Sequence, residues 1–250
     1  MAAIQRSGRC SDIYKEEKTM FYRKAVIIAA LVLFLGVSGL WAGDTASFVD
    51  LGFSPDGRTY MFAQYGVQSR TLKPWADLFV VDVHRNNFVA GGRISLVHDG
   101  PVVSGQDGSG ALYRIIAENA AFAEKYRINY CFQGQPLYIN LENGNPASTI
   151  EFRDFENGSS YRASLVSSIE GSGAALQSSF YINLERTARD GSVKSYTVGT
   201  PQLKRPLIAS YRIRKVVIAP YDGSMILVIE MKKQDGGDFD IRYMVEAVRL

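Results

Sequence analysis

The chain has 250 residues, with 28 Lys and Arg, 25 Asp and Glu and a formal net charge of +3. Residues 1–43 hold six basic and three acidic side chains, which leaves 22 of each sign on residues 44–250. A neutral body removes the usual electrostatic argument for nucleic-acid binding. An apolar content of 46% with 21% charged residues excludes general disorder.

The N-terminal part of the chain has the order of a secretory signal peptide. Residues 21–24 (FYRK) are basic, residues 25–40 carry no charge, and the small residues Ala42 and Gly43 follow. We expect a signal peptide over residues 20–43, cleaved after Ala42 or Gly43, and a secreted or periplasmic protein. An uncleaved membrane anchor over residues 25–42 is the alternative, because the apolar run is only slightly short of a span.

Residues 1–19 are polar and precede Met20, which makes a conventional start with basic residues just after it. They form a doubtful N-terminal extension. Residues 44–250 are expected to form a single exported, β-rich domain. Since Cys131 is the only cysteine of this domain, it cannot contain an internal disulfide.

The domain consists of short β-type runs separated by Asp-Gly and Asn-Gly dipeptides, which favour tight hairpin turns. This pattern predicts a mainly β, antiparallel fold that is propeller-like, with a β-sandwich as the alternative. The predicted strands lie at residues 58–67, 76–83, 149–155, 179–184, 208–219, 225–231 and 239–248.

One segment has helical periodicity instead. Residues 111–126 contain no Gly or Pro, and their apolar side chains recur at helical spacing. We predict one prominent α-helix near residues 110–126, capped by Ser109, whose apolar face packs on the core.

Two pairs of segments hint at an internal repeat. FSPDG at 53–57 resembles IAPYDG at 218–223, and YINLE occurs at 138–142 and again at 181–185. A period near 40 residues is that of a four-stranded propeller blade.

Residues 53–83 resemble the β-propeller repeat of the TolB-like type. Ser54, Pro55, Asp56 and Gly57 match its turn, and residues 77–83 match its last strand. The body as a whole is similar to a family of predicted secreted proteins of unknown function, found in bacteria including spirochaetes, on residues 48–57 and 241–246. This resemblance implies export and supplies no catalytic residues.

Candidates for chemistry are few. Asp82 and His84 share one face of a strand and could join Cys131 as a nucleophile set, although the spacing matches no such family. The Gly-rich stretch 105–110 lacks the lysine of a phosphate-binding loop, so we interpret it as the loop that begins the helix.

Three further groups have ordinary structural interpretations. The acidic cluster in residues 234–240 does not have the spacing of a calcium-binding loop. The basic run is by default a solvated face, although it could bind anionic glycans or phospholipid headgroups. Trp75 is expected to pack within a loop. These groups comprise Asp235, Asp238 and Asp240; Lys204, Arg205, Arg212, Arg214 and Lys215; and Trp75.

The sequence therefore assigns no catalytic, cofactor-binding or metal-binding residue. We expect a non-catalytic envelope binding or scaffold module with an envelope protein or glycan as its partner and no nucleic acid. An envelope hydrolase that acts on cell-wall or glycan material through carboxylates is the alternative. The turn at residues 54–57 is predicted to be structural, so that Gly57→Val should destabilise the fold.

Overall fold

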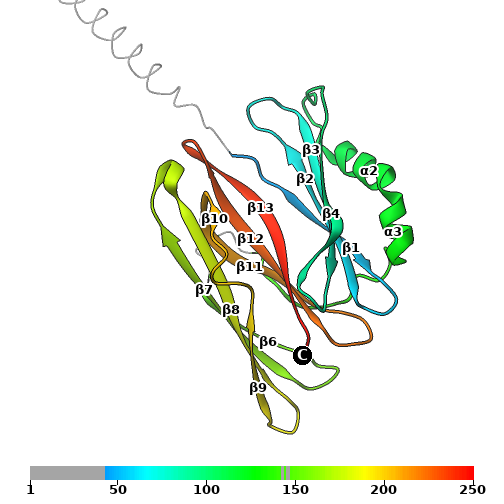
Figure 1. Ribbon diagram of the computed structural model, residues 1–250, viewed down its shortest axis with the longest axis vertical. Helices are drawn as coiled ribbons and strands as arrows, with labels where there is room; N and C mark the ends of the chain where they lie inside the picture. Colours follow the sequence, from blue (N-terminus) through cyan, green and yellow to red (C-terminus); the bar gives the residue numbers. More distant parts are fainter. Residues whose placement is uncertain (1–42, 142–143, 145–146) are drawn as a thin grey trace, which may run out of the picture. The chain divides into compact units, whose positions relative to one another are not determined.

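A computed structural model describes residues 43–141, 144 and 147–250. The predicted signal peptide and the doubtful extension before it, except for Gly43, lie outside these residues. The described chain contains three antiparallel sheets and two α-helices (Figure 1).

The first sheet is a meander of four strands in the order β1-β2-β3-β4. Residue 52 introduces a bulge between β1 and β2, where Gly52 has a positive φ of 107°. The strands are β1 (Ser47–Phe53), β2 (Thr59–Val67), β3 (Pro74–Asp82) and β4 (Asn87–Val97).

Two helices cover one face of this sheet, where the sequence predicted one. They are α2 (Ser109–Glu118) and α3 (Ala120–Tyr126), separated at Asn119, whose side-chain amide donates to the carbonyl of Ile115 at 2.8 Å. The predicted Ser109 cap is wrong: Asp107 accepts the Ser109 N–H at 2.9 Å instead. Neither described helix is long and apolar enough to cross a membrane.

The middle sheet has the order β13-β12-β11-β5. Residues 225–229 of β12 are all buried, because this strand is covered on both faces. A continuous apolar run (MILVI) is what such a strand requires. The strands are β5 (Gln135–Ile139), β11 (Ile208–Ile218), β12 (Met225–Asp235) and β13 (Asp238–Val248).

The third sheet is built on the long hairpin β7–β8. Strand β6 pairs with β7, while β9 and β10 pair with different parts of β8. The strands are β6 (Thr149–Arg153), β7 (Ser160–Glu170), β8 (Gln177–Thr187), β9 (Val193–Val198) and β10 (Arg205–Pro206).

The layers follow one another as helices, first sheet, middle sheet and third sheet (Figure 1). One cluster of buried side chains joins the helices to the first sheet, a second joins the first sheet to the middle one, and a third joins the middle sheet to the third. The fold is mainly β and antiparallel, as predicted. A propeller is not confirmed, because these sheets stack face to face, as in a sandwich.

The segments that hinted at a repeat belong to different sheets. YINLE at 138–142 begins at the end of β5 in the middle sheet, and YINLE at 181–185 lies in β8 of the third sheet. The turn at 53–57 connects β1 to β2 within the first sheet, and the turn at 218–223 connects β11 to β12 within the middle sheet. The two turns contact each other.

Candidate functional site

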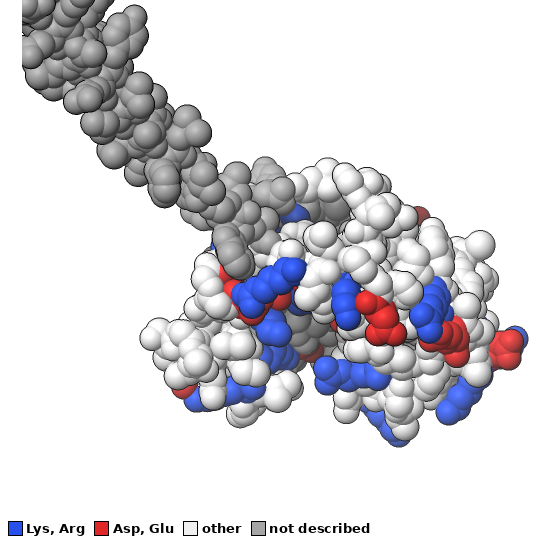
Figure 2. Space-filling view, turned by 90° about the horizontal axis from the view of Figure 1, so that it is seen from above, with Lys and Arg blue, Asp and Glu red and all other residues white. Residues whose placement is uncertain are grey.

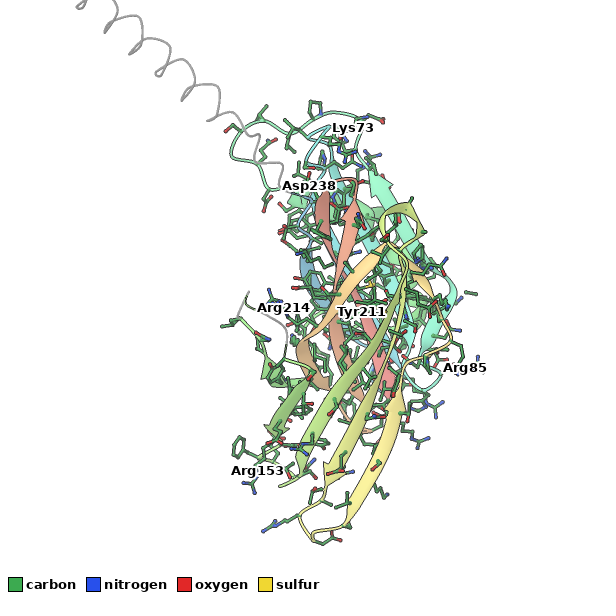
Figure 3. The ribbon with its side chains drawn as sticks, turned by 90° about the vertical axis from the view of Figure 1, so that its left-hand side faces the viewer. Lys73, Arg85, Arg153, Tyr211, Arg214 and Asp238 are labelled. Atoms are coloured by element: carbon green, nitrogen blue, oxygen red, sulfur yellow. The ribbon has the colours of Figure 1, made fainter. Side chains whose placement is uncertain are left out.

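An open groove of about 730 Å³ lies where three connecting segments meet. Residues 131–135 lead into β5, residues 154–157 join β6 to β7, and residues 218–223 join β11 to β12. Figure 3 places Arg153, next to the second segment, at one end of the sheets and Asp238 at the other. The groove therefore lies at the end of the layers remote from the β12–β13 hairpin.

Tyr221 is the conspicuous side chain of the groove. Its ring is stacked on Phe132, with the ring centroids 5.7 Å apart and the planes inclined by 14°, yet the residue is 78% exposed. Its φ is +74°, a left-handed conformation that is costly for an aromatic residue. Burial does not explain this cost, and an outlier of this kind marks a candidate functional position.

Hydrogen bonds to Asp222 fix the conformation of the hairpin that carries Tyr221. Asp222 accepts hydrogen bonds from the N–H and the hydroxyl of Ser224, both at 2.9 Å, and contacts the Nε2 of His84 at 2.7 Å. Burial acts to raise the pKa of Asp222, but the hydrogen bonds from Ser224 and His84 outweigh it and lower that pKa. The carboxylate thus ties the hairpin to the end of β3.

The turn at residues 54–57 supports the same hairpin from the first sheet. Asp56 accepts the Ser54 hydroxyl at 2.6 Å and the Arg58 N–H at 3.1 Å, and these bonds lower its pKa, the Ser54 bond most. Gly57 has a φ of 71°, and a Cβ there would come within 2.6 Å of the Pro220 carbonyl oxygen. The turn therefore packs against Pro220, which lines the groove.

The segment at 154–157 is fixed by its own carboxylate. Asp154 is buried and accepts the N–H groups of Glu156 at 2.9 Å and Asn157 at 3.3 Å. Glu156 and Asn157 are exposed and line the groove. Asp154 thus shapes the turn, and Glu156 and Asn157 present polar groups to a ligand.

Asp50, whose side chain is 8% exposed, is connected to the groove through Gln133. Gln133 donates to the Asp50 carbonyl at 2.9 Å, and Lys215 contacts the Asp50 carboxylate at 3.2 Å. Burial raises the pKa of Asp50 although Lys215 opposes it, and burial beside Asp50 raises the pKa of Tyr60 well above its usual value. This cluster joins β1 and β2 of the first sheet to β11 of the middle sheet, and the Gln133 hydrogen bond fixes one side of the groove to it.

The three residues considered as a nucleophile set have separate partners. His84 contacts Asp222, Asp82 pairs with Arg85 at 3.7 Å, and Cys131 is exposed and lines the groove. No hydrogen bond among the described residues joins Cys131 to either of the others. Their arrangement gives the thiol no adjacent base.

The other predicted groups are also dispersed. Asp235 pairs with Arg70 and Asp240 with Arg242, each at 3.2 Å. Across residues 43–141, 144 and 147–250, no three acidic, His or Cys side chains converge as metal ligands would. Trp75 lies in β3 and not in a loop, and it is buried as expected.

The basic run is paired with carboxylates. Arg214 contacts Glu230 at 2.6 Å, and the other pairs are Lys204 with Glu170, Arg205 with Glu246, Arg212 with Glu230 and Lys215 with Asp50. On the face shown in Figure 2, some basic side chains likewise lie beside acidic ones. Most of this run is an internal ion-pair layer and not the solvated face that we expected.

A second hollow, of about 580 Å³, lies before α2. It is lined by residues 105–110, together with His98 and Arg114. The Gly-rich stretch thus forms the loop and first turn that begin the helix, as the sequence indicates.

Sequence reasoning missed the residues that stand out here. Tyr221 and Asp222 were treated only as part of a turn, and Phe132 was not considered. An aromatic residue directly before Asp-Gly, where small or polar residues are usual, was the available signal.

Comparison with known proteins gives one finding. The model of a family described as "Predicted secreted protein (DUF2259)" matches residues 61–249. The match begins after the turn at 54–57 and confirms neither a TolB-like repeat nor a spirochaete type. Searches of curated proteins and of solved structures found no match.

Proposed function

Because the chain belongs to the family of predicted secreted proteins (DUF2259), we propose that it is an exported envelope protein that binds a glycan in this groove without catalysis. The observation that carries the proposal is Tyr221, an exposed ring held in place by Phe132 at the cost of a left-handed backbone. The envelope is its place of action, in the periplasm or beyond.

A glycan fits the chemistry of the groove. The flat C–H face of a sugar ring packs on an aromatic ring, and sugar hydroxyls exchange hydrogen bonds with amides and carboxylates. Tyr221 supplies the ring, and Gln135, Asn157 and Glu156 line the same groove. A rigid aromatic anchor with a few polar groups is the usual composition of a binding site.

The test is binding of soluble oligosaccharide fragments from the cell wall, measured by calorimetry. Tyr221→Ala should weaken binding about tenfold or more, equivalent to about 1.4 kcal/mol, because it removes the stacking surface. Tyr113→Ala is the matched control, since Tyr113 is also exposed but lies on α2. Equal affinity of Tyr221→Ala and the wild type would contradict the proposal.

Two other outcomes identify the alternatives. Release of product from such fragments, lost in Glu156→Gln, would establish the envelope hydrolase. Absence of glycan binding, with an envelope protein captured in a Tyr221-dependent way from solubilised envelope, would replace the glycan by a protein partner.

A further inference from the structure

The first described residues form an isolated parallel β-bridge to β13, which pairs Thr45 with Ile241. The carbonyl of Asp44 accepts the Ile241 N–H at 2.8 Å, and the Ala46 N–H donates to the Ile241 carbonyl at 3.1 Å. Gly43 lies so close to the chain that a Cβ would come within 1.9 Å of the Phe239 oxygen. Residues 43–46 are thus attached directly to the edge strand of the middle sheet.

Two buried carboxylates surround this segment. Asp44 and Asp240 are only 8% and 7% exposed, and the backbone nitrogen of Asp44 donates to Asp240 Oδ1 at 2.9 Å. Arg242 contacts the carboxylates of Asp44 at 3.3 Å and Asp240 at 3.2 Å while it stacks over Trp75. We call Asp44, Asp240 and Arg242 the N-terminal seat.

The charges of the seat do not balance. Two carboxylates share one guanidinium in a largely buried position, where an uncompensated charge is costly. Removal of the leader after Ala42 or Gly43 would place an α-ammonium group at residue 43 or 44. With cleavage after Gly43, the α-ammonium nitrogen is the Asp44 nitrogen that already donates to Asp240. With cleavage after Ala42, it is the nitrogen of the preceding residue, Gly43.

We propose that the N-terminal seat binds the α-ammonium group of the processed chain. Cleavage then does more than release the protein: it creates the cation that completes the seat and fixes residues 44–46 to β13. Because residues 44–46 are paired with β13, the new α-ammonium group would be held beside the carboxylates of the seat.

The first measurement is the intact mass of the exported protein, which should correspond to a chain that begins at Gly43 or Asp44. The second compares the Tm of this form with that of a chain that retains residues 40–42, which moves the charge out of the seat. We expect the extension to lower the Tm by about 2–4 °C, the shift that corresponds to one buried ion pair of about 1 kcal/mol in a domain of this size.

Asp240→Asn tests the seat itself. In this variant the extension should no longer change the Tm, whereas in Asp238→Asn, on the same strand, it should cost as much as in the wild type. A chain that is uncleaved or begins elsewhere, or an extension that costs the same with and without Asp240, would overturn the proposal. None of these outcomes depends on the glycan groove.

Discussion

Gly57 affects the conformation of a hairpin that is far from it in sequence but adjacent to it in the fold. Its positive φ allows the turn between β1 and β2, and its missing side chain leaves room for the Pro220 carbonyl of the hairpin that carries Tyr221. The two demands are separable, because Gly191 has a similar φ of 84° with nothing within 4 Å of a Cβ.

We expect Gly57→Val to lower the free energy of unfolding by about 1–3 kcal/mol through backbone strain, plus the cost of the contact with Pro220. Gly191→Val carries the strain alone and should cost less. Urea unfolding of both variants gives the comparison. Equal losses would show that the Pro220 contact contributes nothing.

The elements found from the sequence are those whose pattern reflects burial. All seven predicted strands occur, because their apolar residues face a covering layer, and residues 225–229 of β12 are all apolar because that part of the strand is covered on both faces. The prediction missed the described strands β1, β4, β5, β7, β9 and β10. In β4 Gly91 and Gly92 interrupt the pattern, and in β7 serines dilute it. The stacking of the sheets could not be predicted from the sequence, since the turn residues between strands are the same in a propeller and in a sandwich.

The candidate site was less accessible to sequence reasoning than the fold. The groove joins residues 131–135, 154–157 and 218–223, and no local pattern states that these segments meet. The carboxylate partners of Arg205 and Lys215 come from other strands, which is why a paired interior layer looked like a solvated face.

Burial of β12 on both faces makes a prediction for neighbouring positions. Ile226→Ala and Leu227→Ala, which face different layers, should each lower the free energy of unfolding by about 2–5 kcal/mol. In the one-sided strand β6, Ile150→Ala should be costly but Glu151→Ala should cost at most about 1 kcal/mol. Chemical denaturation measures all four, and a small effect at Ile226 or Leu227 would contradict the central position of β12.

At the scale of the whole molecule, polar side chains connect the layers. Glu246 of the middle sheet accepts a hydrogen bond from Asn86, beyond β3, at 2.5 Å and contacts Arg205 of the third sheet at 3.5 Å. Asp222 and His84 make a second link between the first two sheets at the groove end. Such links fix the orientation of sheets whose apolar faces could otherwise slide.

The Asp222 link predicts a dependence on pH. Because the folded state lowers the pKa of Asp222, its contribution to stability is present above the usual aspartate pKa of about 3.9 and is lost as the pH falls through the lower folded value. Asp222→Asn should therefore be less stable than the wild type at pH 7, and the difference should shrink below about pH 4. Urea unfolding between pH 3 and 7 measures this, and a constant difference would contradict it.

The position of the middle sheet also governs when the protein can acquire its structure. Three of its four strands, β11 to β13, occupy residues 208–248, so they are synthesised after every strand of the first and third sheets. Until they emerge, the inner faces of the first and third sheets have nothing to cover them. The β-bridge at the start of the domain waits for the same moment, because its partner, β13, lies at the other end of the chain. The full stack of sheets can therefore form only once β11 to β13 are available, and a chain that folds late in this way would suit the export that we propose.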